Sequence, residues 1–295
     1  MRVVTLLPAA TEMVAALGAG DRLVGISHEC DFPDSVSHLP RVTATPIDSS
    51  RPGAAIDAQV RALRQAGRPV IAIDTDQLRR LAPELIVTQG LCEVCAVSDG
   101  EVHRLSRVLS PAPQILSLNA RTLAGVWDDI RCVATALGRQ SQAEHLIGRL
   151  EGRLARLQAS QPPVRPRVVC VEWLEPLYLA GHWVPEQLAA AGAEDVGAQP
   201  GSHSTRREWE DLLPLRPDVV VIALCGFGVE RAKGELDALQ HDVALRLLAD
   251  KPVWIVDGNA YTSRPGPRIV DGAERLQAAL LGREMPGLAR WTIPG

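Results

Sequence analysis

A proline-free stretch with helical periodicity, residues 119–158, constrains the fold of this chain more than any other feature. No proline falls between Pro113 and Pro162, and apolar residues recur there at the three- and four-residue spacing of amphipathic helices. Gly138 interrupts the pattern, and Ser141 through Glu144 match a capping box, so we expect two helices, 120–137 and 141–158. The second helix would be about 27 Å long, roughly the diameter of a small domain. One long helix between two stretches of strands and loops is typical of a strut.

Strands alternate with helices on both sides of this stretch, which predicts βαβ units and mostly parallel sheets. We therefore expect an α/β fold of two Rossmann-like lobes: an N-terminal lobe over residues 1–119, a helical linker over 120–160 and a C-terminal lobe over 161–295. The predicted strands are 3–7, 23–26, 70–73, 85–88 and 114–118 before the linker, and 168–171, 218–224 and 253–256 after it. Helices are expected between them, among others over 102–109, 208–213 and 235–248.

The composition of the chain limits the classes of function that it can have. With 46% hydrophobic residues, the 295-residue chain can bury a large core, and a net charge of -4 argues against nucleic-acid binding. No apolar run reaches the roughly 18 residues of a transmembrane helix. The first residues predict a strand entering a helix rather than a signal peptide, and the six cysteines fit reduced thiols. We therefore expect a cytoplasmic protein, or a periplasmic or surface-attached one if the chain is a mature or non-classically exported form.

Scarce residue types gather just after the predicted strands. The chain has only two Phe, two Tyr and six Trp, and both Phe, both Tyr and two Trp lie in or beside these segments. In open α/β sheets, ligands bind outside the carboxyl ends of the strands. We expect one cleft between the lobes for a large, flat, partly apolar ligand, with Trp173 and Trp183 on its wall. The alternative is that the aromatic residues fill the contact between the lobes.

Several motifs together resemble one known family. They are residues 5–12, 24–33 and 88–95 in the first half, and 172–173, 181–186, 225–227, 257–261 and 264–267 in the second. They are similar to the cobalamin-binding subgroup of the iron/cobalamin periplasmic-binding-protein superfamily. The resemblance implies two α/β lobes joined by a rigid helix, one corrinoid between them and an ABC importer permease as partner. Expected ligand contacts are His28, Glu29, Phe32, Glu172, Trp173, His182, Trp183, Phe227, Asn259, Tyr261 and Arg264.

Histidines and cysteines in these motifs have the chemistry of metal ligands. His28 or His182 could coordinate a corrin cobalt as the neutral imidazole, or either could serve only in hydrogen bonds. His28 and Cys30 together with Cys92 and Cys95 have the ligand types of a closed zinc site, and iron is also possible. The cysteine pair could equally be a redox pair, or the cysteines could simply line loops.

The charged residues of the motifs also leave alternatives open. Glu29 and Glu172 could accept hydrogen bonds from ligand amides or pair with Arg264. The prolines that follow Arg264 would hold it rigidly, as a clamp for ligand amide or phosphate oxygens. It could instead support the carboxylate of Asp257 or Asp271.

The sequence favours binding over catalysis. It has no nucleophile elbow, no phosphate-binding glycine-rich loop and no H-E-x-x-H motif. We predict a monomeric corrinoid-binding protein of the ABC-transporter substrate-binding type, without a catalytic cofactor. The alternatives are a binding protein for haem or an iron chelate, and a cytoplasmic redox enzyme with a Cys/His metal site.

Overall fold

The computed structural model describes residues 1–90, 109–161, 164–239 and 241–293, and the chain divides into two compact units. The first unit is Met1–Arg51, Ala58–Ala120 and Ala124–Arg149, and the second is Pro52–Asp57, Arg121–Leu123 and Leu150–Gly295. The lobe boundaries at 119 and 160 stay a prediction.

The first unit has a four-stranded parallel sheet in the order β2-β1-β5-β6. Its strands are β1 (Val3–Thr5), β2 (Leu23–Gly25), β5 (Leu85–Gln89) and β6 (Gln114–Leu118). β1 and β5 are buried throughout, as expected of parallel strands covered on both faces. These four predicted strands are confirmed. The prediction at 70–73 yields only the short β4 (Ala72–Ile73), which pairs antiparallel with β3 (Thr43–Ala44).

Helices follow the strands of the first half as the alternation predicts. They are α1 (Pro8–Ala16), α2 (Gly53–Gln65), α3 (Thr75–Leu81), α5 (Leu123–Leu137) and α6 (Gln140–Ala159), with 3₁₀ turns at Gly20–Arg22 and Asp34–Val36. Pro8 occupies the first turn of α1, where its missing N–H costs nothing. The helix expected over 102–109 lies almost wholly outside the described residues.

The helices α5 and α6 confirm the pattern of the central stretch, but the capping box was wrong. α6 begins one residue before Ser141, which places Ser141 inside the first turn. The carboxylate of Glu144 instead accepts a hydrogen bond from Arg131 of α5 at 2.9 Å. The role of α6 as a strut stays a prediction.

The second unit contains a seven-stranded mixed sheet in the order β10-β8-β7-β11-β12-β13, with β9 paired to β7. Its strands are β7 (Arg167–Leu174), β8 (Leu177–Leu179), β9 (Glu194–Asp195), β10 (Thr205–Arg206), β11 (Val219–Ile222), β12 (Val253–Val256) and β13 (Leu288–Trp291). β7, β11 and β12 run parallel at its centre, which confirms the three predicted strands.

The β7–β8 hairpin corrects one placement. Glu172 and Trp173 lie within β7, not in a loop after it, and the chain returns antiparallel along β8 after the turn at Glu175 and Pro176. The reason is that β8 offers a hydrogen-bonding partner to the last residues of β7, so the strand extends past its apolar core.

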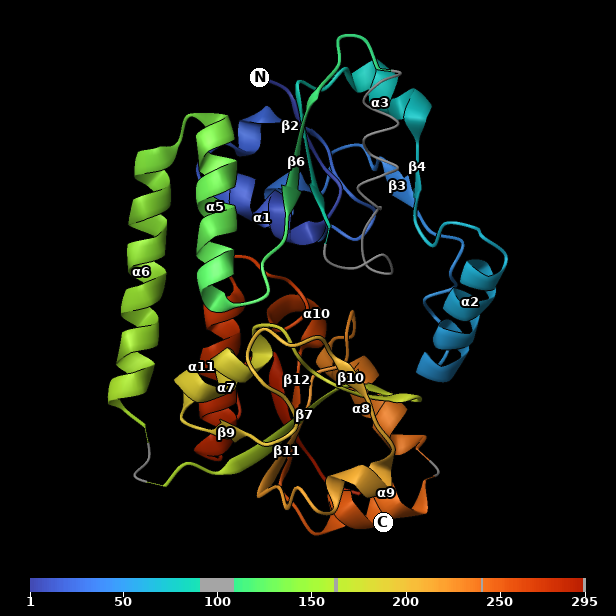
Figure 1. Ribbon diagram of the computed structural model, residues 1–295, viewed down its shortest axis with the longest axis vertical. Helices are drawn as coiled ribbons and strands as arrows, with labels where there is room; N and C mark the ends of the chain where they lie inside the picture. Colours follow the sequence, from blue (N-terminus) through green and yellow to red (C-terminus); the bar gives the residue numbers. More distant parts are fainter. Residues whose placement is uncertain (91–108, 162–163, 240, 294–295) are drawn as a thin grey trace. The chain divides into compact units, whose positions relative to one another are not determined.

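Helices cover both faces of this sheet. They are α7 (Val184–Ala191), α8 (Val229–Asp237), α9 (Asp242–Ala249), α10 (Gly258–Tyr261) and α11 (Ile269–Leu280), with a 3₁₀ turn at Trp209–Leu212 where a helix over 208–213 was predicted. One helix predicted over 235–248 is in fact two, α8 and α9. Side chains of α8 and α9 join the core on one sheet face, while α7 and α11 lie on the other side (Figure 1). Among the helices of the described ranges, none has the length and apolarity to span a membrane.

Candidate functional site

Two buried side chains, at the N-cap and in the first turn of α7, hold this helix against the segment that follows β12. Trp183 is 5% exposed, and its indole N–H donates to the carbonyl oxygen of Thr262 at 2.8 Å. The amide of Gln187, one turn later and fully buried, donates to the carbonyls of Tyr261 at 3.0 Å and Ile269 at 2.7 Å. These bonds fix the loops that carry His182 and Arg264. Trp183 therefore offers little free surface to a ligand.

His182 is held in an uncommon backbone conformation beside this anchor. Its φ is 54°, its N–H donates to Ser202 at 2.6 Å, and its carbonyl accepts from Gly201 at 2.8 Å. A side chain on Gly181 would come within 2.5 Å of the Ser202 carbonyl, so the crossing of the two loops requires glycine there. The backbone on both sides of His182 is thus fixed.

The environment of His182 favours the neutral imidazole. Burial lowers the pKa of His182, and the nearby His203 and Arg121 lower that pKa further. The ring of His203 stands at 87° to that of His182, with 5.3 Å between centroids. Within the described ranges, no hydrogen bond to the ring nitrogens of His182 is found, so the ring can accept a new partner.

The loops after β11 and β12 meet at the carboxyl edge of the sheet. The N–H of Asn259 donates to the carbonyl of Phe227 at 3.2 Å, and a side chain on Gly258 would collide with the carbonyl of Leu224. Arg264 is buried and donates to the Asn259 side chain at 2.8 Å. This guanidinium therefore supports the short helix α10 through Asn259, and its role as a ligand clamp stays a prediction.

Asp257 and Asp271, the two carboxylates that the sequence offers as partners of Arg264, have other contacts. Asp257 caps α10 by accepting from Ala260 at 2.9 Å, and Asp271 pairs with Arg153 of α6. The ring of Tyr261 lies against the guanidinium of Arg275, 3.7 Å from the ring centroid, so this ring is already in contact with a cation.

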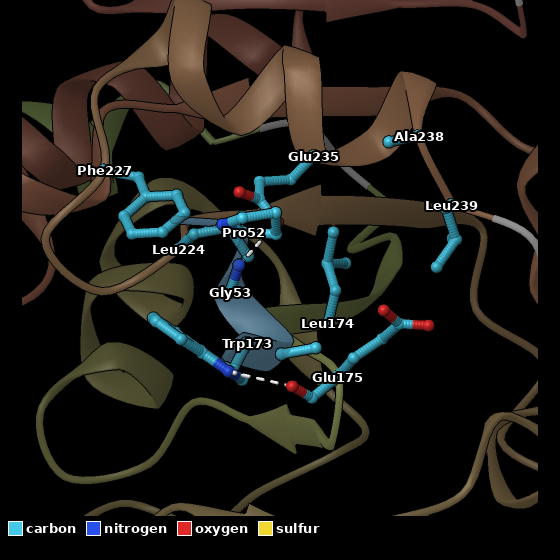
Figure 2. A pocket seen from close by; sticks show the side chains of 11 residues that line it. Pro52, Gly53, Trp173, Leu174, Glu175, Leu224, Phe227, Glu235, Ala238 and Leu239 are labelled. Carbon is cyan, nitrogen blue, oxygen red and sulfur yellow. Dashed lines mark hydrogen bonds between the residues drawn. The ribbon is translucent and has the colours of Figure 1, made fainter. Parts of the chain in front are cut away.

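Trp173 and Phe227 line a cavity of about 250 Å³ in the second unit (Figure 2). Their rings meet edge to face with 5.3 Å between centroids, and the guanidinium of Arg231 lies 3.8 Å from the Phe227 centroid. Glu172, the neighbour of Trp173 in β7, does not line this cavity.

The site residues of the first unit follow β2. His28 is half-buried and its Nδ1 lies 2.7 Å from the hydroxyl of Thr43; burial, and then Arg41, lowers the pKa of His28. Cys30 is buried, with its sulfur 3.0 Å from the Thr11 hydroxyl. Glu29 is exposed and Phe32 is 42% exposed.

Cys92 and Cys95 lie outside the described residues, so the proposed His/Cys metal site remains untested. Among the residues that the structure describes, no group of three or more His, Cys, Asp or Glu side chains is placed to hold a metal ion.

Sequence reasoning missed three residues that shape these loops. Gln187 was hidden inside an apolar helix, although its place four residues after Trp183 puts both on one helix face. Glu186 accepts from the backbone N–H of Leu123 at 2.6 Å, and Glu235 accepts from that of Gly53 at 2.9 Å. The residues next to each carboxylate in the sequence do not indicate its role, because its hydrogen-bond partner is distant in the sequence.

Comparisons with known proteins match this architecture along nearly its whole length. A vitamin B12-binding protein of Vibrio cholerae is 24% identical over 282 residues, covering 93% of this chain and 87% of that protein. The structure of a periplasmic heme-binding protein from Pseudomonas aeruginosa superposes with a TM-score of 0.70 at 21% identity, covering 100% of this chain and 99% of that one. That of the periplasmic vitamin B12 binding protein of Vibrio cholerae gives 0.65 at 21% identity, covering 95% and 96%. The model of the periplasmic binding protein family matches residues 3–249, and the chain belongs to that family.

Proposed function

We propose that this protein binds a corrinoid such as cobalamin and serves as the substrate-binding component of an ABC importer. Family membership supports capture of a small molecule, and the curated relative from Vibrio cholerae is named for vitamin B12. The similarity to structures of heme-binding proteins shows a shared fold and leaves the ligand open. The family and its named members do not support the cytoplasmic location expected from the sequence; we propose a periplasmic or surface-attached one.

One observation favours a chelated metal as the ligand's centre, namely the ring of His182. A bare zinc ion needs three or four protein ligands, whereas a metal already held by the four nitrogens of a tetrapyrrole needs only one or two more. His182 provides one neutral imidazole on a fixed backbone, with the edge of His203 beside it. A single well-placed ring therefore suits a corrinoid cobalt better than a free ion.

Haem is the second candidate, because an imidazole also ligates haem iron. Its support is the same ring and the fold shared with heme-binding proteins. The redox enzyme has less support, since the chain belongs to a family of binding proteins and Cys92 and Cys95 lie outside the described residues.

Titration of aquocobalamin tests the proposal, because its exchangeable axial water can be replaced by an imidazole. We expect saturable binding with a shift of the visible bands for the wild type, and loss of the shift in His182→Ala. His145→Ala, an exposed position on α6, is the matched control and should behave as wild type. Because the pKa of His182 is lowered, the shift should persist below pH 6.5, where an ordinary histidine becomes protonated.

A parallel titration of His28→Ala separates the two histidines. A shift lost in His28→Ala but kept in His182→Ala would move the axial ligand to the first unit. Binding without a shift of the visible bands, in the wild type and in both variants, would show that neither histidine coordinates the cobalt.

A further inference from the structure

The cavity beside Trp173 differs in shape and chemistry from a tetrapyrrole site. Pockets for drug-sized ligands occupy about 300–1,000 Å³, whereas a cavity of about 150 Å³ already accepts benzene. At about 250 Å³, this cavity is too small for a corrin or a porphyrin and fits one or two fused rings. Its natural occupant is a small flat group.

The walls of the cavity are aromatic and aliphatic. Trp173 and Phe227 form one side, and Leu174 and Leu239 lie across from them (Figure 2). The edge-to-face contact between Trp173 and Phe227 holds both rings in place. Such walls favour a flat apolar ring.

Two carboxylates supply the polar part of the lining. Glu175 lies at the turn of the β7–β8 hairpin and Glu235 on α8. No Lys, Arg or His is among the described residues that line the cavity; Arg231 contacts the Phe227 ring without lining it. Ionised carboxylates only accept hydrogen bonds, so this lining selects an N–H donor and disfavours an anion.

A separate segment of the chain closes the remaining side. Pro52, Gly53 and Ala54, at the start of α2, line the cavity, and the N–H of Gly53 donates to Glu235 at 2.9 Å. A side chain on Gly53 would lie 3.4 Å from the Trp173 ring, so the backbone packs closely on the indole. Pro52 and Ala54 are exposed, which places this wall at the surface and gives a ligand a way in.

We propose that this cavity is a binding site for a flat aromatic heterocycle of one or two rings that carries an N–H donor. The ring lies against Trp173 and Phe227, and its N–H donates to Glu175 or Glu235. The heterocycle is a free small molecule that carries its own N–H. This proposal depends only on the cavity, and it holds whether or not the protein binds a corrinoid.

Calorimetric titration with indole and benzofuran tests the site, because the two probes share a shape and differ in the N–H. Indole should bind saturably, and benzofuran about tenfold more weakly, since benzofuran cannot donate a hydrogen bond to Glu175 or Glu235. No saturable indole binding to the wild type, or equal binding of the two probes, would overturn the proposal.

Filling the cavity provides the second test. Ala238 is exposed at the end of α8 and lines the cavity, so Ala238→Phe should occupy the space without disturbing the core. We expect indole affinity to fall at least about tenfold in Ala238→Phe. Ala249→Phe, at the exposed end of α9, is the matched control and should bind indole as wild type does. Unchanged indole binding in Ala238→Phe would place the probe elsewhere and contradict the site.

Titration of Ala238→Phe with cobalamin separates this site from the proposed function. If Ala238→Phe removes indole binding and leaves cobalamin binding unchanged, the occupant is a free small molecule. Equal weakening of indole and cobalamin binding would make the cavity part of the corrinoid site and contradict the proposal. Failure of cobalamin to bind the wild type would refute the proposed function and leave the indole result intact.

Discussion

At the residue scale, burial outweighs hydrogen bonding at Asp195. Its Oδ1 accepts from the backbone of Gly197 at 2.8 Å and of Ala198 at 3.0 Å, which lowers the pKa of Asp195, yet burial raises that pKa to about 6. Its Oδ2 is buried and without a hydrogen-bond partner in the described structure. Asp195 therefore releases its proton at higher pH in the folded protein than in the unfolded chain.

Asp195→Asn should stabilise the protein at neutral pH. Between pH 4 and 6 the folded state holds a proton that the unfolded state has lost, so wild-type stability falls as pH rises through this window. The amide oxygen of asparagine can keep both backbone bonds without the charge. We expect a gain of about 1–2 kcal/mol at pH 7 and almost none below pH 4, measured by urea unfolding at both values. Glu194→Gln, an exposed neighbour, is the control; a variant less stable than wild type at pH 7 would contradict the account.

The residues of the candidate site show what sequence can and cannot predict. The types of His182 and Trp183, and their positions in a loop after a strand, indicated that these residues belong to the site. The sequence did not predict that Trp183 is buried and donates to Thr262. The left-handed backbone of His182 is held by hydrogen bonds with Gly201 and Ser202, which lie about twenty residues later in the chain. Such partners arise from tertiary packing, and no local pattern encodes them.

At the element scale, Arg153 fastens the last turns of α6 to α11. Its guanidinium pairs with Glu274 through two hydrogen bonds, at 2.8 and 2.6 Å, and with Asp271. These bonds raise the pKa of Arg153 above its usual range. The amide of Gln277 adds a bond to the Leu157 carbonyl at 2.9 Å.

Arg153→Met should loosen this contact while keeping the length of the side chain. Two half-buried carboxylates would lose their cation, so we expect a loss of about 1–2 kcal/mol in unfolding free energy. Arg149→Met, an exposed position one turn earlier, should change stability by less than about 0.5 kcal/mol. Equal stability of the two variants in urea unfolding would show that the ion pairs add nothing.

Most elements could be predicted from periodicity, and the exceptions have physical reasons. The strands β1, β5, β11 and β12 could be predicted from runs of apolar residues, because a strand buried on both faces consists of consecutive apolar residues. The strands β8 and β13 were missed, since short strands on the antiparallel side carry weak patterns and depend on β7 and β12 for pairing. The break between α8 and α9 was also missed, because apolar spacing continues across it.

At the scale of the whole molecule, the α/β architecture expected from the sequence agrees with the structure and with the family match. Each of the two units contains a sheet with parallel strands at its centre. The fold was predictable because it follows from the order of strands and helices along the chain. The ligand was not, because structures named for heme and for vitamin B12 share this fold.

Binding of cobalamin compared with haem by the wild-type protein tests the central claim most directly. Calorimetric titration of the purified protein with each ligand, under identical conditions, gives both dissociation constants. We predict saturable binding of cobalamin at one site per chain, at least about tenfold tighter than that of haem. Tighter binding of haem, or no binding of cobalamin at micromolar concentrations, would contradict it.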